Sequence, residues 1–143
     1  MTEIKKIRIL IADDFKVLRD VIRLYRERAG DMGVIGEAPD LNDALERAQT
    51  LQPDVIILND YLPPVDSAYA AALFRERGIE AAILTISMDI EPDLVHRSLR
   101  SGINGFIHKD EINVCIVDAI LSIHQGKRYL SPRAQEAYDR SPE

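Results

Sequence analysis

The fold is decided by the stretch Pro53-Asp54-Val55-Ile56-Ile57-Leu58-Asn59-Asp60-Tyr61-Leu62-Pro63-Pro64. Its run of four apolar residues, three of them β-branched, predicts a strand that is covered on both faces, as in a parallel sheet. Asn59 and Asp60 follow at the carboxyl end of this strand, where open α/β sheets place their ligands. The two prolines then end the strand. We therefore expect a buried central strand with a polar site at its end.

Strand and helix patterns alternate along the rest of the chain. Four more strands are predicted at 7–12, 34–37, 81–86 and 105–108, and helices at 14–29, 40–51, 66–77, 92–101 and 113–124. Such alternation favours a parallel sheet with right-handed crossovers and helices on both faces. After Gly126 the pattern changes, and the segment 127–143 is predicted to be a linker with a polar end that frays.

Composition and charge exclude several classes of protein. The 143 residues are enough for one domain without disulfides, and Cys115, the only cysteine, has apolar neighbours that indicate a buried side chain in a reducing compartment. The formal net charge is −6 with acids and bases interspersed, which argues against direct binding of nucleic acid. No run is apolar enough for a signal peptide or a membrane span, so we expect a cytoplasmic protein without membrane contact.

Polar side chains follow four of the predicted strands. They are Asp13, Asp14, Asn59, Asp60, Ser87 and Lys109. Because the carboxyl ends of parallel strands share one edge of the sheet, we expect these side chains to form one pocket. Carboxylate oxygens suit Mg²⁺, and a hydroxyl and an ammonium suit phosphoryl oxygens. His96, His108 and His124 lack the spacing of metal ligands and are interpreted as ordinary surface or strand residues.

At these residues the chain closely resembles the receiver domain of two-component response regulators, over about 7–125. The resemblance rests on Asp13-Asp14, on the form Pro-Asp-Val-Ile-Ile-Leu-x-x-x-Leu-Pro in the third strand, on Ser87, and on Gly105-Phe106-Ile107-His108-Lys109. The later Gly126-Lys127-Arg128-Tyr129-Leu130-Ser131-Pro132 resembles the NarL/LuxR-type subgroup, in which a linker leads to a helix-turn-helix domain. The resemblance implies a flavodoxin-like (CheY-like) fold, with a doubly wound five-stranded parallel sheet in the order 2-1-3-4-5. We expect the receiver over 1–126 and, over 127–143, the start of a connection to a C-terminal domain that the chain lacks.

The resemblance also implies roles and partners, but no enzymatic activity. Mg²⁺ would be held by Asp13, Asp14, the residue at position 59 and the backbone carbonyl of Tyr61; Ser87 and Lys109 would contact the phosphoryl group, and Phe106 would be the switch aromatic. A sensor histidine kinase would supply the phosphoryl group. The switch would act on the face of the fourth helix, fifth strand and fifth helix. A homodimer would use this face or the first and fifth helices, and DNA would be bound through the missing domain.

The phosphoacceptor position departs from the family pattern. The family has an aspartate four residues before the proline, and this count from Pro63 leads to Asn59. An amide is neutral and a far poorer nucleophile than a carboxylate, so phosphorylation and tight Mg²⁺ binding should both suffer. Asp60 is adjacent, but strand alternation predicts that it points to the opposite face. Ser67 replaces a common glycine and Phe15 a common histidine, which reshapes the pocket rim.

Three hypotheses remain open at this point. In the first, Asn59 is an engineered replacement of an aspartate in a receiver that normally switches a transcriptional output. In the second, the chain is a natural pseudo-receiver that signals through protein contacts without phosphorylation. The third is a small-molecule-binding or phosphotransfer module of flavodoxin-like fold, which the absence of a glycine-rich phosphate loop disfavours.

Overall fold

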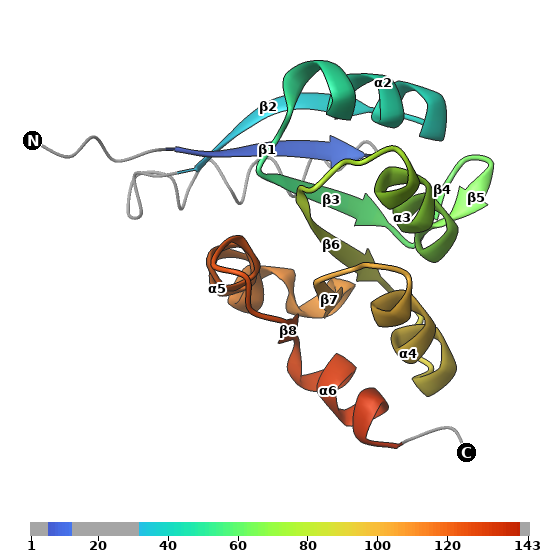
Figure 1. Ribbon diagram of the computed structural model, residues 1–143. Helices are drawn as coiled ribbons and strands as arrows, with labels where there is room; N and C mark the ends of the chain where they lie inside the picture. Colours follow the sequence, from blue (N-terminus) through green and yellow to red (C-terminus); the bar gives the residue numbers. More distant parts are fainter. Residues whose placement is uncertain (1–5, 13–31, 141–143) are drawn as a thin grey trace, which may run out of the picture.

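The computed structural model describes residues 6–12 and 32–140 of the chain (Figure 1). The elements, in chain order, are β1 (Ile7–Ala12), β2 (Met32–Ala38), α2 (Leu41–Leu51), β3 (Val55–Asn59), β4 (Tyr61–Leu62), β5 (Val65–Asp66), α3 (Ser67–Glu76), β6 (Ala82–Ser87), α4 (Pro92–Arg100), β7 (Gly105–His108), the 3₁₀ turn η1 (Lys109–Glu111), α5 (Ile112–His124), β8 (Tyr129–Leu130) and α6 (Pro132–Asp139). The predicted helix at 14–29 lies outside the described residues, as do Asp13, Asp14 and Phe15.

The main sheet has the order β2-β1-β3-β6-β7-β8, and all its strand pairs are parallel. Its first five strands, taken along the chain, have the predicted order 2-1-3-4-5. The fold class is therefore confirmed. The structure adds a sixth strand, β8, beside β7, and a small antiparallel pair, β4 and β5, directly after β3.

The two faces of the sheet are buried by different helices. On one face Leu10, Ile56 and Ile83 pack with α2 and α3, and on the other Ile9 and Ile57 pack with α5. Consecutive residues at 9–12 of β1 and at 55–58 of β3 therefore contribute to opposite cores, which explains why these two runs are continuously apolar. Cys115 of α5 is buried and free, as predicted.

Two helices begin at the predicted aspartate caps. Asp40 accepts a hydrogen bond from the Asp43 N–H (2.9 Å), and Asp66 accepts one from the Tyr69 N–H (2.8 Å). The Arg97 guanidinium lies 3.1 Å from the Asp66 carboxylate. Partial burial raises the pKa of Asp66, but the Tyr69 N–H and Arg97 together outweigh it, so that this pKa lies below its usual 3.8.

The side chain of Arg75 joins three segments at the amino ends of β6 and β7. Its guanidinium donates to the main-chain oxygens of Ile79 (2.8 Å), Ala81 (2.7 Å) and Gly102 (2.8 Å), and to Asn104 Oδ1 (3.0 Å). Gly102 has φ +103°, and a Cβ there would lie 2.9 Å from Arg75 Cγ. The arginine thus fixes the chain at the edge of the sheet opposite the candidate site.

The segment after Gly126 folds onto the sheet. Tyr129 and Leu130 of β8 pair with Gly105 and Phe106 of β7, and α6 then packs against α4 and β7. Figure 1 shows α6 (red) beside α4, below the end of the sheet. The expected fraying is therefore wrong for 129–139, because Ser131 caps α6 and apolar side chains anchor it, whereas the connection of 127–143 to a further domain stays a prediction.

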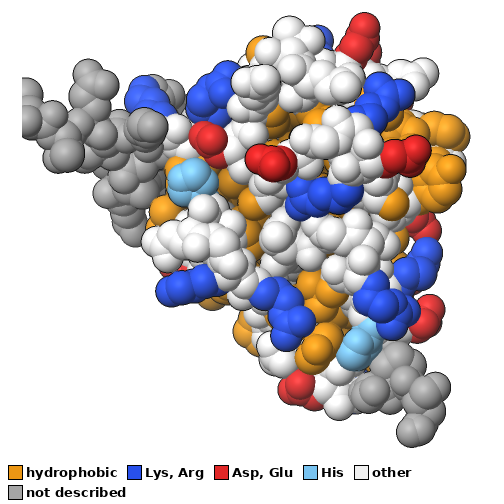
Figure 2. Space-filling view, in the orientation of Figure 1, with side chains coloured by type: hydrophobic (Ala, Val, Ile, Leu, Met, Phe, Trp, Pro, Cys, Tyr) orange, Lys and Arg blue, Asp and Glu red, His pale blue; other side chains and the backbone are white. Residues whose placement is uncertain are grey.

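The visible surface carries mixed charge. In Figure 2, Lys and Arg side chains (blue) alternate with Asp and Glu (red), and apolar patches lie between them. No helix among the described residues is long and apolar enough to cross a membrane.

Candidate functional site

The predicted site residues gather at the carboxyl ends of three adjacent strands. Asn59 ends β3, Ser87 ends β6 and His108 ends β7. The register pairs Asn59 with Ile86 and pairs Ser87 with His108, so these ends lie side by side. Lys109 follows His108 as the first residue of η1. The described part of the predicted constellation is thus assembled at one edge of the sheet.

Asp60 points toward Ser87, against the expectation from strand alternation. The Ser87 hydroxyl donates a hydrogen bond to Asp60 Oδ2 over 2.8 Å. β3 ends at Asn59, so Asp60 lies beyond the strand and its side chain is not bound by the alternation. Its N–H donates to Asn59 Oδ1 (3.0 Å) and to the main-chain oxygen of Ile86 (3.1 Å). The edge of the sheet therefore carries a carboxylate, one residue later than in the family pattern.

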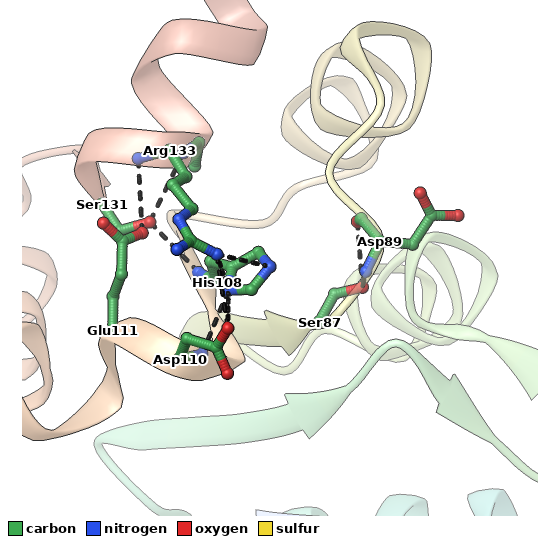
Figure 3. A network of polar contacts seen from close by, with 8 residues as sticks. Ser87, Asp89, His108, Asp110, Glu111, Ser131 and Arg133 are labelled. Atoms are coloured by element: carbon green, nitrogen blue, oxygen red, sulfur yellow. Dashed lines mark hydrogen bonds and ion pairs between the residues drawn. The ribbon is translucent and has the colours of Figure 1, made fainter.

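The Ser87 hydroxyl is buried, and it both donates and accepts a hydrogen bond. Besides its bond to Asp60, its Oγ lies 3.0 Å from the Asp89 main-chain oxygen and accepts a hydrogen bond from the Asp89 N–H (2.9 Å). Figure 3 shows Ser87 under the turn that carries Asp89, whose carboxylate points away from it. A hydroxyl has one proton, so the two oxygens compete for it, and the charged carboxylate is the stronger acceptor.

The other predicted ligands are only partly described. Tyr61 lies in β4 and is 54% exposed, and Lys109 is also exposed. Within 6–12 and 32–140, no three His, Cys, Asp or Glu side chains lie close enough together to hold a metal ion. An Mg²⁺ site at this edge would therefore need the oxygens of Asp13 and Asp14 in addition to those described here.

Phe106, the predicted switch aromatic, is completely buried. It packs with Val95 of α4 and with Ala134 and Ala137 of α6. In the register of the sheet it pairs with Thr85, two residues before Ser87. The aromatic ring is thus covered by the C-terminal helix, a contact that sequence reasoning missed.

A polar network joins the end of β7 to α6 (Figure 3). The His108 N–H donates to Ser131 Oγ (3.1 Å), and His108 Nδ1 accepts from the Asp110 N–H (3.0 Å). The Arg133 guanidinium pairs with the Asp110 carboxylate (3.3 Å), and the main-chain N–H of Arg133 donates to Glu111 Oε1 (3.3 Å). The network fixes both ends of the turn that begins with Lys109. The dipeptide Ser131-Pro132, a helix cap followed by proline at the first position, was the sequence signal for α6.

Of the two other histidines, His96 packs against α6 and His124 lies at the surface. His96 of α4 stacks on Tyr138 of α6, with ring centroids 4.4 Å apart, and its Nε2 lies 2.9 Å from the Tyr138 main-chain oxygen. The guanidinium of Arg128 lies over the Tyr138 ring, 4.7 Å from the ring centre. His124 is exposed at the end of α5. These contacts add to the attachment of α6.

Known proteins similar to the chain share one domain. Residues 9–121 match the profile of the response regulator receiver domain. The probable transcriptional regulatory protein NarL of Mycobacterium tuberculosis is 33% identical over 128 residues, which make up 90% of this chain and 59% of that protein. The chain thus spans about three fifths of the length of this relative.

Solved structures show the same similarity. The signal receiver domain of NarL from Mycobacterium tuberculosis matches with a TM-score of 0.76 and 33% identity, covering 86% of this chain and 99% of that one. A two-component response regulator of the LuxR family from Aurantimonas sp. SI85-9A1 matches with a TM-score of 0.84 and 26% identity, covering 95% and 98%.

Proposed function

The chain belongs to the response regulator receiver domain family, and we propose that it is a receiver in which Asn59 disables phosphorylation. The family is a signalling family rather than a catalytic one. The observation that carries the proposal is the amide at the end of β3, four residues before Pro63. Its oxygen accepts a hydrogen bond from the Asp60 N–H, so it is directed at the chain's own backbone.

The chemistry of the amide supports this proposal. A carboxylate attacks phosphorus through an anionic oxygen, whereas the Asn59 oxygen is neutral and the amide nitrogen has no available lone pair. Ser87 and Lys109 would remain suited to hold phosphoryl oxygens. The site therefore keeps its binding groups and lacks the nucleophile.

Magnesium binding would be weakened for the same reason. The ligands would be Asp13, Asp14, the Asn59 amide oxygen and the Tyr61 carbonyl, all of them oxygens, which suits Mg²⁺. One ligand has lost its negative charge. We expect weak binding in titrations, and tighter binding in Asn59→Asp.

The partners follow from the kind of relative. NarL is named a transcriptional regulator and is longer than this chain, so we propose a cytoplasmic protein whose residues 127–143 lead toward a DNA-binding domain. A sensor histidine kinase and a second copy of the chain are the other proposed partners. The dimer would use α5 together with the segment 14–29, or the face of α4, β7 and α5.

Incubation with Mg²⁺ and acetyl phosphate tests the proposal. We expect the intact mass of the protein to stay unchanged, whereas Asn59→Asp gains one phosphoryl group. Asn42→Asp, which adds the same charge on the exposed side of α2, is the matched control and should stay unmodified. A phosphoryl adduct on the protein with Asn59 would overturn the proposal.

The alternative function is an interaction module that signals without phosphorylation. The Asp60–Ser87 hydrogen bond favours it, because the switch hydroxyl already has an anionic partner. Measured output separates the two functions. If Asn59→Asp gains phosphate and changes output, the receiver was disabled at one atom; if it gains phosphate and leaves output unchanged, the module signals independently. The codon at position 59 of the source gene distinguishes an engineered asparagine from a natural one.

A further inference from the structure

The Asp60 carboxylate accepts a hydrogen bond from the Ser87 hydroxyl, whose other contacts are with the main chain of Asp89. Ser87 is 1% exposed, and the Asp60 carboxylate lies 2.8 Å from its oxygen. The backbone of Asp60 is fixed as well, since its N–H donates to Ile86 and its carbonyl accepts from the Ser67 N–H (2.9 Å). The carboxylate is therefore held in place by β6 and by the start of α3.

Two short routes lead from Ser87 to α6. Along the sheet, Ser87 pairs with His108, whose N–H donates to Ser131 Oγ, the cap of α6. Along the chain, the Ser87 hydroxyl contacts the N–H and the carbonyl oxygen of Asp89, three residues before α4 begins. α4 then contacts α6 directly. A shift of Ser87 would thus move both β7 and α4, the two elements that α6 packs against.

α6 contacts this surface through two alanine side chains and Tyr138. Ala134 and Ala137 enter a cluster with Phe106 and Val95, and Tyr138 stacks on a histidine of α4. Alanine side chains bury little area, so the helix depends on the shape of the surface beneath it. A helix of eight residues would also be marginal without that surface.

We propose that the Asp60 carboxylate is a built-in partner of the Ser87 hydroxyl, in the role that a phosphoryl group would have, and that this bond keeps α6 docked on α4 and β7. This inference rests on the proposed function, because a receiver that cannot be phosphorylated needs another group to hold Ser87. Asp60 acts through Ser87 and is a positioning residue. In the docked form the chain covers its own switch surface.

Hydrogen exchange of the full chain, without any phosphodonor, tests the inference. Asp60→Ala and Ser87→Ala both remove the Asp60–Ser87 hydrogen bond, and Ser87→Ala also removes the contacts of the hydroxyl with the Asp89 main chain. Asp60→Ala should raise the exchange rate of the α6 amides about tenfold, the value expected for one lost bond to a charged group, and Ser87→Ala should raise it at least as much. Asp89→Ala is the matched control, since the contacts of Asp89 with Ser87 use only main-chain atoms, and its α6 amides should exchange as in the unmodified protein. The amides of β1 and β3 should stay protected in all variants, which shows that the fold persists.

The double variant decides whether the two residues act together. Asp60→Ala with Ser87→Ala should raise exchange in α6 no further than Ser87→Ala alone, since Ser87→Ala already removes the bond to Asp60. Additive increases, or an unchanged α6 in Asp60→Ala, would overturn the inference and leave the proposed function intact. Asp60→Asn, which keeps the size of the side chain and weakens the acceptor, should give an intermediate increase and serves if the alanine variant does not fold. A phosphoryl adduct on the unmodified protein would instead contradict the proposed function without altering these exchange rates.

Discussion

Replacing Arg75 by alanine should lower the free energy of unfolding by about 4 kcal/mol. The guanidinium makes four hydrogen bonds, and a bond from a charged donor contributes about 1.5–3 kcal/mol when fully buried. Arg75 is only partly buried, so water replaces part of each lost bond, and we reduce the contribution to about 1 kcal/mol per bond. Arg75→Lys should cost about 2 kcal/mol, because one ammonium cannot reach the acceptors of both guanidinium arms.

Urea unfolding followed by circular dichroism measures this effect. For a domain of this size we expect the midpoint for Arg75→Ala to fall by about 2 M at an unchanged m value. Arg77→Ala, two residues later, is the matched control, since its only side-chain hydrogen bond within the described residues, to Gln49, is long (3.4 Å) and exposed. It should change stability by less than about 0.5 kcal/mol. If the midpoints of the Arg75 and Arg77 variants coincide, the hydrogen bonds of Arg75 contribute nothing net and the reasoning is refuted.

Two further predictions concern the sheet and the cap of α3. Gly105→Ala should destabilise the domain by about 1–3 kcal/mol, since the new Cβ would lie 2.8 Å from Leu84 Cδ1. Gly33→Ala is the control and should be close to neutral in the same urea assay, because its new Cβ would have no atom within 4 Å. Equal midpoints for the two variants would contradict the steric argument. Asp66→Asn keeps the cap and loses the charge, so the unmodified protein should be slightly more stable at pH 7. Because the folded pKa of Asp66 lies below its usual 3.8, this advantage is present above that pH and is lost as the pH falls through the folded value; an advantage that persists at pH 2 would show another cause.

The sequence predicted the fold well because its strands carry a strong signal. β1 and β3 are buried on both faces, and only continuous apolar runs satisfy such positions. The aspartate caps of α2 and α3 could also be predicted, because each side chain accepts a hydrogen bond from a backbone N–H only three residues later in the sequence. Features fixed by neighbours in sequence were therefore predictable.

The features that were missed depend on neighbours in space. β8 has two residues, too few for any periodicity, and its pairing partner is 24 positions earlier in the chain, as the pair Gly105 and Tyr129 shows. The direction of Asp60 was predicted from alternation, a rule that holds only inside a strand, and the strand ends one residue before it. The partners of Arg75 are mostly main-chain oxygens, which leave no trace in a sequence. The predicted roles of Asp13 and Asp14 stay predictions.

The sixth strand has a consequence for how the domain avoids strand pairing between molecules at the edge of its sheet. Without β8, the outer side of β7 would present unpaired N–H and C=O groups, and such an open edge is a template for strands of other molecules. β8 covers it with Tyr129 and Leu130 alone, and a strand of two residues is too short to serve as a new template. A fragment cut after Gly126, at the boundary expected from the sequence, would expose this edge and the Phe106 ring together. Fragments prepared for binding or structural work should therefore extend to about residue 140.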